Sequence, residues 1–92
     1  MDTSDLLLGQ IVCSKAGRDK GKFMVVVEII DSQYVRVCDG QTRKIDKAKK
    51  KKVKHLAKTN HIISTINKKL EEKQRINNAE IRKHLNDLGY NI

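Results

Sequence analysis

The chain has 92 residues, which is enough for one compact domain with a short appendage. Its 20 basic and 11 acidic residues give a net charge of +9, which favours a polyanionic partner. No apolar run approaches the roughly 18 residues that a membrane-spanning helix needs, so we expect a cytoplasmic protein with Cys13 and Cys38 as free thiols.

Segments of alternating or continuously apolar sequence predict five short β-strands. The strands are joined by tight turns, among them the connection at residues 32–33 and the Asp39-Gly40 pair, which favour antiparallel hairpins. The predicted strands cover residues 10–15, 23–31, 34–38, 42–46 and 53–57. Short strands with tight turns indicate a small closed or partly closed barrel, so residues 1–58 are expected to form a mainly β domain.

The predicted strand at residues 34–38 alternates cleanly between apolar and other residues. Val35 and Val37 are expected to face the core, whereas Tyr34, Arg36 and Cys38 face the other way.

After residue 58 the apolar period changes from two to about 3.6, which predicts a helical extension over residues 59–92. Ile62, Ile63, Ile66 and Leu70 fit one helix face, although residues 62–66 are also compatible with an extended segment. Neither predicted helix is apolar enough to be stable alone, so each should dock on the barrel or on a partner.

The second predicted helix has clear start and stop signals. Asn77 can serve as its N-cap with Glu80 three residues later, and Gly89 supplies a C-terminal stop. Ile81, Leu85 and Leu88 are expected to line its apolar face.

The segment between the first two predicted strands combines glycine with positive charge. Gly17 and Gly21 allow a sharp turn, because only glycine takes positive φ without a steric penalty. Arg18, Lys20 and Lys22 lie on this turn and Lys15 precedes it. A basic loop held by a rigid strand is suited to contact phosphate, and an ordinary solvated hairpin is the alternative.

Nearly all the excess positive charge lies in residues 40–58, which hold nine basic groups and one acidic group. Lysine ammonium groups act as point charges on phosphates and read little base sequence. A self-repelling loop or a nuclear-localisation signal would also explain such a run. The candidate RNA contacts in this window are Arg43, Lys44, Lys47, Lys49, Lys50, Lys51, Lys52 and Lys54.

The aromatic content separates two modes of RNA binding. Proteins that hold single strands usually stack bases on aromatic rings, yet this chain has only Phe23, Tyr34 and Tyr90. Phe23 is expected in the core. Tyr34 shares a predicted strand face with Arg36, so the pair is a candidate site for one base, or simply an exposed strand face. The composition therefore favours phosphate and shape recognition of folded RNA.

Catalytic and metal-binding signatures are missing from the sequence. The cysteines and histidines show no spacing typical of a zinc site, so we expect no metal and no cofactor. The chain has no phosphate-binding P-loop and no nucleophile elbow, so we do not expect an enzyme.

Several short segments of the first half keep a distinctive order and spacing: residues 9–12 (GQIV), 16–22 (AGRDKGK), 25–31 (VVVEIID), 34–37 (YVRV), 39–40 (DG) and 54–56 (KHL). Together they resemble the KOW-motif proteins, and among these the large-subunit ribosomal proteins of the archaeal and eukaryotic type. The resemblance implies an SH3-like barrel, rRNA or protein contact through the loop after the first strand, and a ribosomal location. His55 belongs to this signature, as a phosphate contact or as a structural hydrogen bond.

The leading hypothesis is therefore a ribosome-associated protein that contacts structured rRNA of the large subunit through the basic loop and the lysine cluster. The alternative is a protein-docking module of a transcription or translation complex, with the C-terminal helix as the partner helix.

Overall fold

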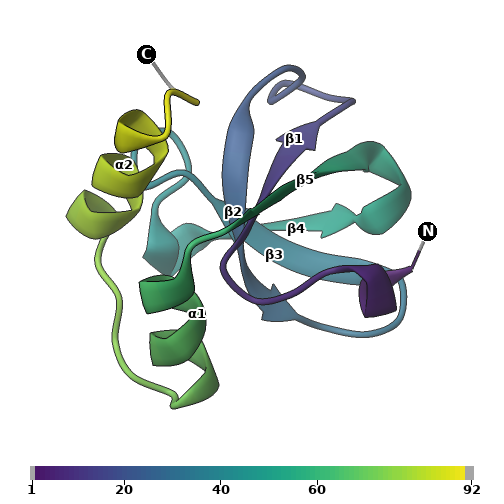
Figure 1. The fold of residues 1–92 in the computed structure, drawn as a ribbon. Coiled ribbons are helices and arrows are strands. Elements are labelled where there is room, and N and C mark those ends of the chain that lie inside the picture. The colour runs from purple at the N-terminus through teal and green to yellow at the C-terminus, as the bar shows by residue number, and fades with distance from the viewer. Residues whose placement is uncertain (1, 91–92) are drawn as a thin grey trace.

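Five antiparallel strands and two C-terminal helices make up the regular structure of residues 2–90, the part of the chain that the computed structural model describes (Figure 1). The sheet has the strand order β4-β3-β2-β1-β5. Its strands are β1 (Gln10–Ser14), β2 (Phe23–Ile29), β3 (Tyr34–Cys38), β4 (Lys49–Lys52) and β5 (Leu56–Ile62). The helices are α1 (Ser64–Glu71) and α2 (Asn78–Asp87).

The sheet remains open, in contrast to the closed form of the predicted barrel. β4 pairs only with β3 and β5 pairs only with β1, so these two strands form the edges. A 3-10 turn over Val53–His55 joins them and bends the chain from one edge to the other. Because two helices are integral to its core, the fold is mixed α/β rather than mainly β.

The first three strand predictions are confirmed to within two residues. β2 ends at Ile29 because the next residues turn: Ile30 N–H donates to the Tyr34 carbonyl, and the Asp31 carboxylate accepts from the Gln33 and Tyr34 N–H groups. The hairpin predicted at residues 32–33 therefore forms, with its turn stabilised by Asp31.

The last two strand predictions are wrong in position. Residues 42–46 are not a strand, because the Asp39 carboxylate accepts from the Gln41 and Arg43 N–H groups and holds the chain in a turn. A 3-10 turn over Ile45–Lys47 follows, and the lysine run itself forms β4. The final strand begins at Leu56 and continues to Ile62, so part of the segment expected to be helical is extended.

Both faces of the sheet are buried at Met24, Val25 and Val26, which explains the continuous apolar sequence of β2. We call the side that carries Val35 and Val37 the inner face; its core consists of Leu6, Val12, Met24, Val26, Val35, Val37, Val53 and Leu56. We call the opposite side the outer face; its core consists of Ile11, Val25, Cys38, Ile63, Ile66, Ile81 and Leu85. The predicted alternation of β3 is confirmed, and Cys38, on the side opposite to Val35 and Val37, is buried under the helices.

The two helices pack on the outer face and lie on the same side of the sheet (Figure 1). As predicted, the Asn77 side chain caps α2 by accepting the Glu80 N–H at 2.8 Å, and Ile81 and Leu85 are fully buried. Leu88 is 45% exposed and does not join this face. Ile81 and Leu85 of α2 are therefore used within the chain, and of the predicted apolar face only Leu88 remains exposed.

Within residues 2–90 no helix combines the length and the apolar character that crossing a membrane requires.

Candidate nucleic-acid interface

The loop between β1 and β2 is a tight, hydrogen-bonded turn. Gly17 and Gly21 both have positive φ, at 76° and 86°. Within the loop the Gly21 N–H donates to the Ser14 carbonyl at 2.8 Å, and the Lys22 N–H donates to the Asp19 carbonyl at 2.8 Å. This backbone fixes the loop and leaves Arg18, Lys20 and Lys22 exposed around it. The glycine-based turn predicted from the sequence is confirmed.

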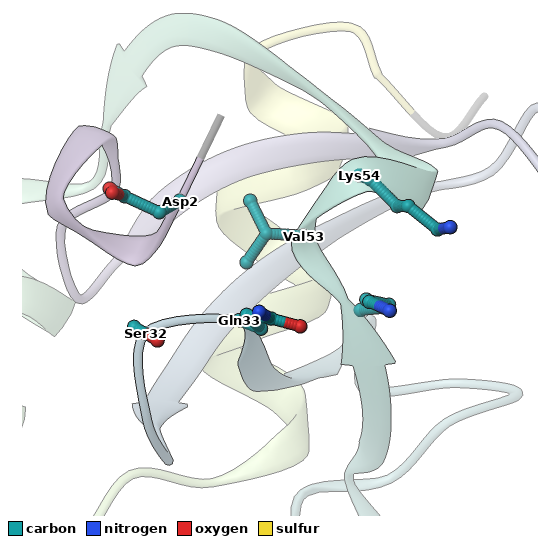
Figure 2. A pocket seen from close by; sticks show the side chains of 6 residues that line it. Asp2, Ser32, Gln33, Val53 and Lys54 are labelled. Carbon is teal, nitrogen blue, oxygen red and sulfur yellow. The ribbon is translucent and has the colours of Figure 1, made fainter.

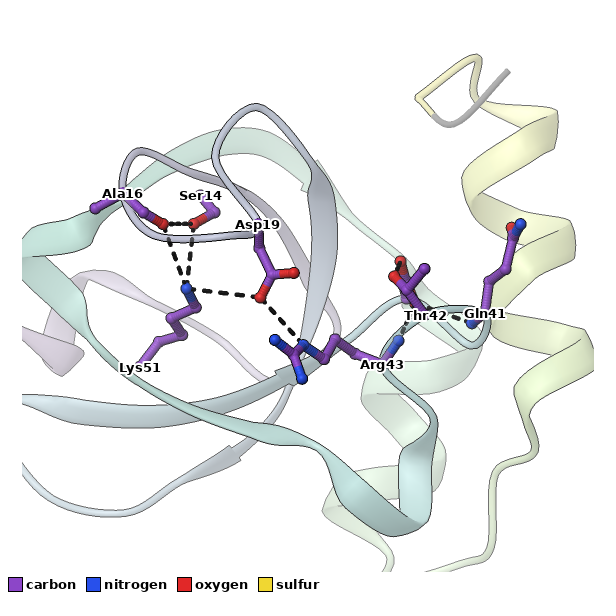
Figure 3. A network of polar contacts seen from close by, with 8 residues as sticks. Ser14, Ala16, Asp19, Gln41, Thr42, Arg43 and Lys51 are labelled. Carbon is purple, nitrogen blue, oxygen red and sulfur yellow. Dashed lines mark hydrogen bonds and ion pairs between the residues drawn. The ribbon is translucent and has the colours of Figure 1, made fainter.

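Asp19 connects this loop to the lysine-rich half of the chain (Figure 3). Asp19 is 3% exposed, and its carboxylate Oδ2 lies 3.1 Å from Arg43 Nε and 3.7 Å from Lys51 Nζ. Lys51 Nζ is also 3.4 Å from Ser14 Oγ and 3.5 Å from the Ala16 carbonyl. The loop, the turn after β3 and the edge strand β4 therefore meet at one buried carboxylate.

Lys51 differs from the other lysines of its run. It is only 9% exposed, and its ammonium group is directed at Asp19 and at oxygens of the β1–β2 loop. A buried cation requires such partners, because an unpaired charge away from water is strongly unfavourable. Its place in the fold is therefore that of a structural cation, although the sequence grouped it with the RNA contacts.

Strand geometry divides the lysine run between the two faces of the sheet. Lys49 and Lys51 are in register with Val37 and Val35, so they point to the inner face. Lys50 and Lys52 are in register with Arg36 and Tyr34, so they point to the outer face. Sequence reasoning treated the run as one cluster, because it placed these residues outside any strand.

The basic side chains therefore form two groups on opposite faces of the sheet. We use the name loop basic face for the three cations of the β1–β2 loop, together with Arg43, which pairs with Asp19 of that loop, and Lys49, which points to the same side of the sheet as Lys51. The three loop cations are Arg18, Lys20 and Lys22. The outer basic face consists of Tyr34, Arg36, Lys50 and Lys52.

The outer basic face combines one ring with three cations. Lys50 Nζ lies 4.6 Å and Lys52 Nζ 5.9 Å from the centre of the Tyr34 ring, within the range of cation–π attraction. Arg36 Nε is 2.9 Å from a Glu28 carboxylate oxygen, and both side chains are about half exposed, so this ion pair is weak and open to competition. Tyr90, in contrast, packs on Phe23 with 4.6 Å between ring centres.

The remaining candidates flank these two faces. Lys44 and Lys47 are exposed around the turn at residues 45–47, and Lys54 and His55 are exposed on the turn at residues 53–55. The Lys15 N–H donates to the His55 carbonyl at 2.8 Å, which places these two residues beside each other.

A pocket of about 410 Å³ lies where the turn after β4 meets the β2–β3 turn (Figure 2). It is lined by Asp2, Ser32, Gln33, Lys52, Val53 and Lys54. Ser32 and Gln33 were missed by sequence reasoning, which treated them only as a hairpin connection. In this view Asp2 and Lys54 lie on opposite sides of Val53, so the pocket has one acidic and one basic side.

Asp39 keeps its charge next to this basic region. Burial raises the pKa of its carboxyl, but the N–H groups of Arg43 and Gln41, the Thr42 hydroxyl and the nearby Lys22 charge outweigh burial and hold the pKa below its ordinary value. The ionised carboxylate fixes the turn that carries Arg43 to Asp19.

The thiol of Cys38 is not activated as a nucleophile. Burial, followed by the neighbouring Asp39 charge, raises its pKa to about 12, so it remains protonated at neutral pH. No group of three or more His, Cys, Asp or Glu side chains that could hold a metal occurs between residues 2 and 90.

Comparison with known proteins adds no relative to this picture: no family model matches the chain, and no curated protein is detectably similar to it.

Proposed function

We propose that this chain binds structured RNA, with rRNA of the large ribosomal subunit as its target, through phosphate contacts and recognition of shape. The observation that carries the proposal is the loop basic face: four of its five cations are in no ion pair with a carboxylate within residues 2–90, although the Lys22 charge does lie near Asp39. These four are Arg18, Lys20, Lys22 and Lys49. Their charge is available to phosphates, which need no base-specific geometry.

The arrangement of the backbone supports the same proposal. An order of β4-β3-β2-β1-β5, with a 3-10 turn between the last two strands, is compatible with the SH3-like barrel that the KOW resemblance implies. On this interpretation residues 9–56 are a KOW-type unit. The basic β1–β2 loop then occupies the place where such proteins contact rRNA.

The mode of binding follows from the side chains on the surface. Lysine and arginine cations on a rigid loop attract a folded polyanion without reading its bases. Tyr34 is the one ring on either basic face, so stacking contributes at a single position at most. We therefore propose that affinity depends on phosphate spacing and RNA shape rather than on sequence.

The measurement is a titration of a labelled rRNA fragment at increasing salt. If about five phosphates are neutralised, the log–log salt slope should be about −4. The variant Arg18→Gln/Lys20→Gln should weaken binding about tenfold and flatten the slope by about 2, equally for unrelated folded RNAs. The matched control Lys68→Gln/Lys83→Gln removes the same charge from exposed positions on α1 and α2 and should change binding much less.

A salt-independent interaction, or equal effects of the two variants, would overturn the proposal. Sedimentation of a cell lysate adds the cellular test: the protein should migrate with the large subunit and dissociate at high salt.

A protein-docking role is the second candidate, and one specific feature favours it. A pocket of about 460 Å³ lies between the sheet and the α1–α2 connection, with Val27, Ile45 and Leu70 among the apolar residues that line it and Arg75 among the charged ones. Ribonuclease separates the two candidates, because partners bound through RNA are lost on digestion and partners bound to this pocket remain.

A further inference from the structure

The edge strand β4 presents cations to two opposite sides of the molecule. It has only β3 as a paired neighbour, so its other edge is free, while Lys51 on its inner side packs against Ser14 of β1 and Asp19 of the β1–β2 loop. The helices cover the outer face around Cys38, at the other end of β3, and leave Tyr34 half-buried and Arg36 exposed. The loop basic face and the outer basic face are therefore both accessible.

The sheet lies between the two basic faces. Val35 and Val37 of β3 are fully buried on the inner face. Lys51 and Asp19 fill the space between β4 and the β1–β2 loop. A phosphate that contacts Lys50 on the outer face is thus separated by the sheet from Lys49 and the loop. The side chains of one strand point to two separate binding surfaces.

The two faces also differ in chemistry. The loop basic face carries cations without an aromatic ring, which suits the regular phosphates of a duplex. The outer basic face combines three cations with the Tyr34 ring, which suits an unpaired segment whose bases can stack.

From this arrangement we propose that one molecule bridges two RNA segments, with a duplex on the loop basic face and an unpaired segment on the outer basic face. This inference rests on the RNA binding proposed above and adds its stoichiometry and architecture. A bridging protein would hold together two parts of a folded RNA that meet at the β3–β4 edge.

The experiment uses a short stem-loop RNA labelled with either a donor or an acceptor fluorophore, mixed with the full chain. Bridging predicts energy transfer between the two labels and a sedimenting complex of two RNAs per protein. The variants Lys50→Glu/Lys52→Glu and Arg18→Glu/Lys20→Glu should each lose the energy transfer while still binding one RNA. The control Lys68→Glu/Lys83→Glu should retain both signals.

The outcomes distinguish this inference from the proposed function. A wild-type complex with one RNA and no energy transfer overturns bridging and leaves RNA binding intact, whereas no binding at all overturns both. Energy transfer that survives in Lys50→Glu/Lys52→Glu, or a protein that sediments as a dimer without RNA, also overturns bridging.

A measurement on the wild-type chain guards against misfolded variants. During NMR titration, bridging predicts that amide resonances of the β1–β2 loop and of β3–β4 shift at different RNA equivalents. Simultaneous shifts at one equivalent would indicate one continuous site and contradict the inference.

Discussion

Asp19 is a buried carboxylate beneath a basic surface, and its position makes its effect on RNA binding testable. Simple electrostatics predicts that its removal strengthens binding, because a negative charge near phosphate disappears. Its ion pairs with Arg43 and Lys51 predict the opposite, because they fix the loop. We expect Asp19→Asn to destabilise the fold by about 3 kcal/mol and to weaken RNA binding several-fold.

Chemical denaturation and RNA titration measure the two effects of Asp19→Asn. Asp46→Asn is the matched control, since Asp46 is exposed and makes no ion pair among the described residues. It should change stability by less than about 0.5 kcal/mol and slightly strengthen binding. Tighter binding by Asp19→Asn would contradict the structural role of this carboxylate.

Asp39 should make the free energy of unfolding depend on pH in the acidic range. The folded state holds its pKa below the ordinary value of 3.8, so the ionised form stabilises the fold above that value. This stabilisation is lost as the pH falls through the lowered pKa. We expect Asp39→Asn to reduce stability by about 1 kcal/mol at neutral pH and by clearly less at about pH 2.5. Denaturant titrations at both pH values measure the difference, and an equal loss at both would disprove it.

Among the elements, the turn after β3 depends on its close approach to α2. Gly40 has φ of 74°, and a Cβ at this position would lie 2.4 Å from the Asn78 carbonyl oxygen. The Gly40 carbonyl also accepts a hydrogen bond from Arg82 Nη1 at 2.7 Å. A methyl group here would therefore separate the turn from the helix.

Gly40→Ala should consequently destabilise the protein more than Gly21→Ala. Gly21 has a similar φ of 86° but nothing within 4 Å of an added Cβ, so the comparison isolates the steric clash. We expect a loss of about 1 kcal/mol for Gly21→Ala, from the left-handed backbone, and a further 2 kcal/mol or so for Gly40→Ala. Thermal denaturation of both variants measures this, and equal losses would show that the clash is relieved by movement of α2.

Elements with strong local signals were predictable from the sequence. The β-branched run of β2 and the Asn77 cap of α2 each follow from residues close in the chain. β4 was not predictable in this way, because consecutive lysines have no strand preference of their own. They become a strand through pairing with β3, which is a tertiary interaction. The strand predicted at residues 42–46 fails for a local reason: the Asp39 carboxylate accepts from the Arg43 N–H, a group that sequence reasoning had assigned to that strand.

At the scale of the whole molecule, the helices and the sheet share the core of the outer face, so they should unfold together. Leu85 is fully buried against the outer face, whereas Leu88 is 45% exposed. We expect Leu85→Ala to cost about 3 kcal/mol and Leu88→Ala less than about 1 kcal/mol, each with a single transition. Circular dichroism during denaturation tests this. A variant that loses helix signal while the sheet transition stays unchanged would show that α1 and α2 fold separately from the sheet.

The candidate site was predictable in composition but not in layout. The sequence identified the basic loop and the lysine window, and the structure brings them together through Asp19. Which lysines face the same way depends on the register of β4 with β3, which no local pattern in the lysine run encodes. For the same reason the burial of Lys51 was invisible, because it depends on a carboxylate far away in the chain.

Because Cys38 is buried, its reactivity would report separation of the helices from the sheet. The thiol is fully buried between the sheet and the helices, while Cys13 is partly accessible. A thiol-reactive reagent should therefore modify Cys13 in the native protein and reach Cys38 only in molecules whose helices have lifted away. The ratio of the modification rates of Cys38 and Cys13, followed by mass spectrometry, would measure the fraction of molecules in which the helices have separated from the sheet, without any engineered label.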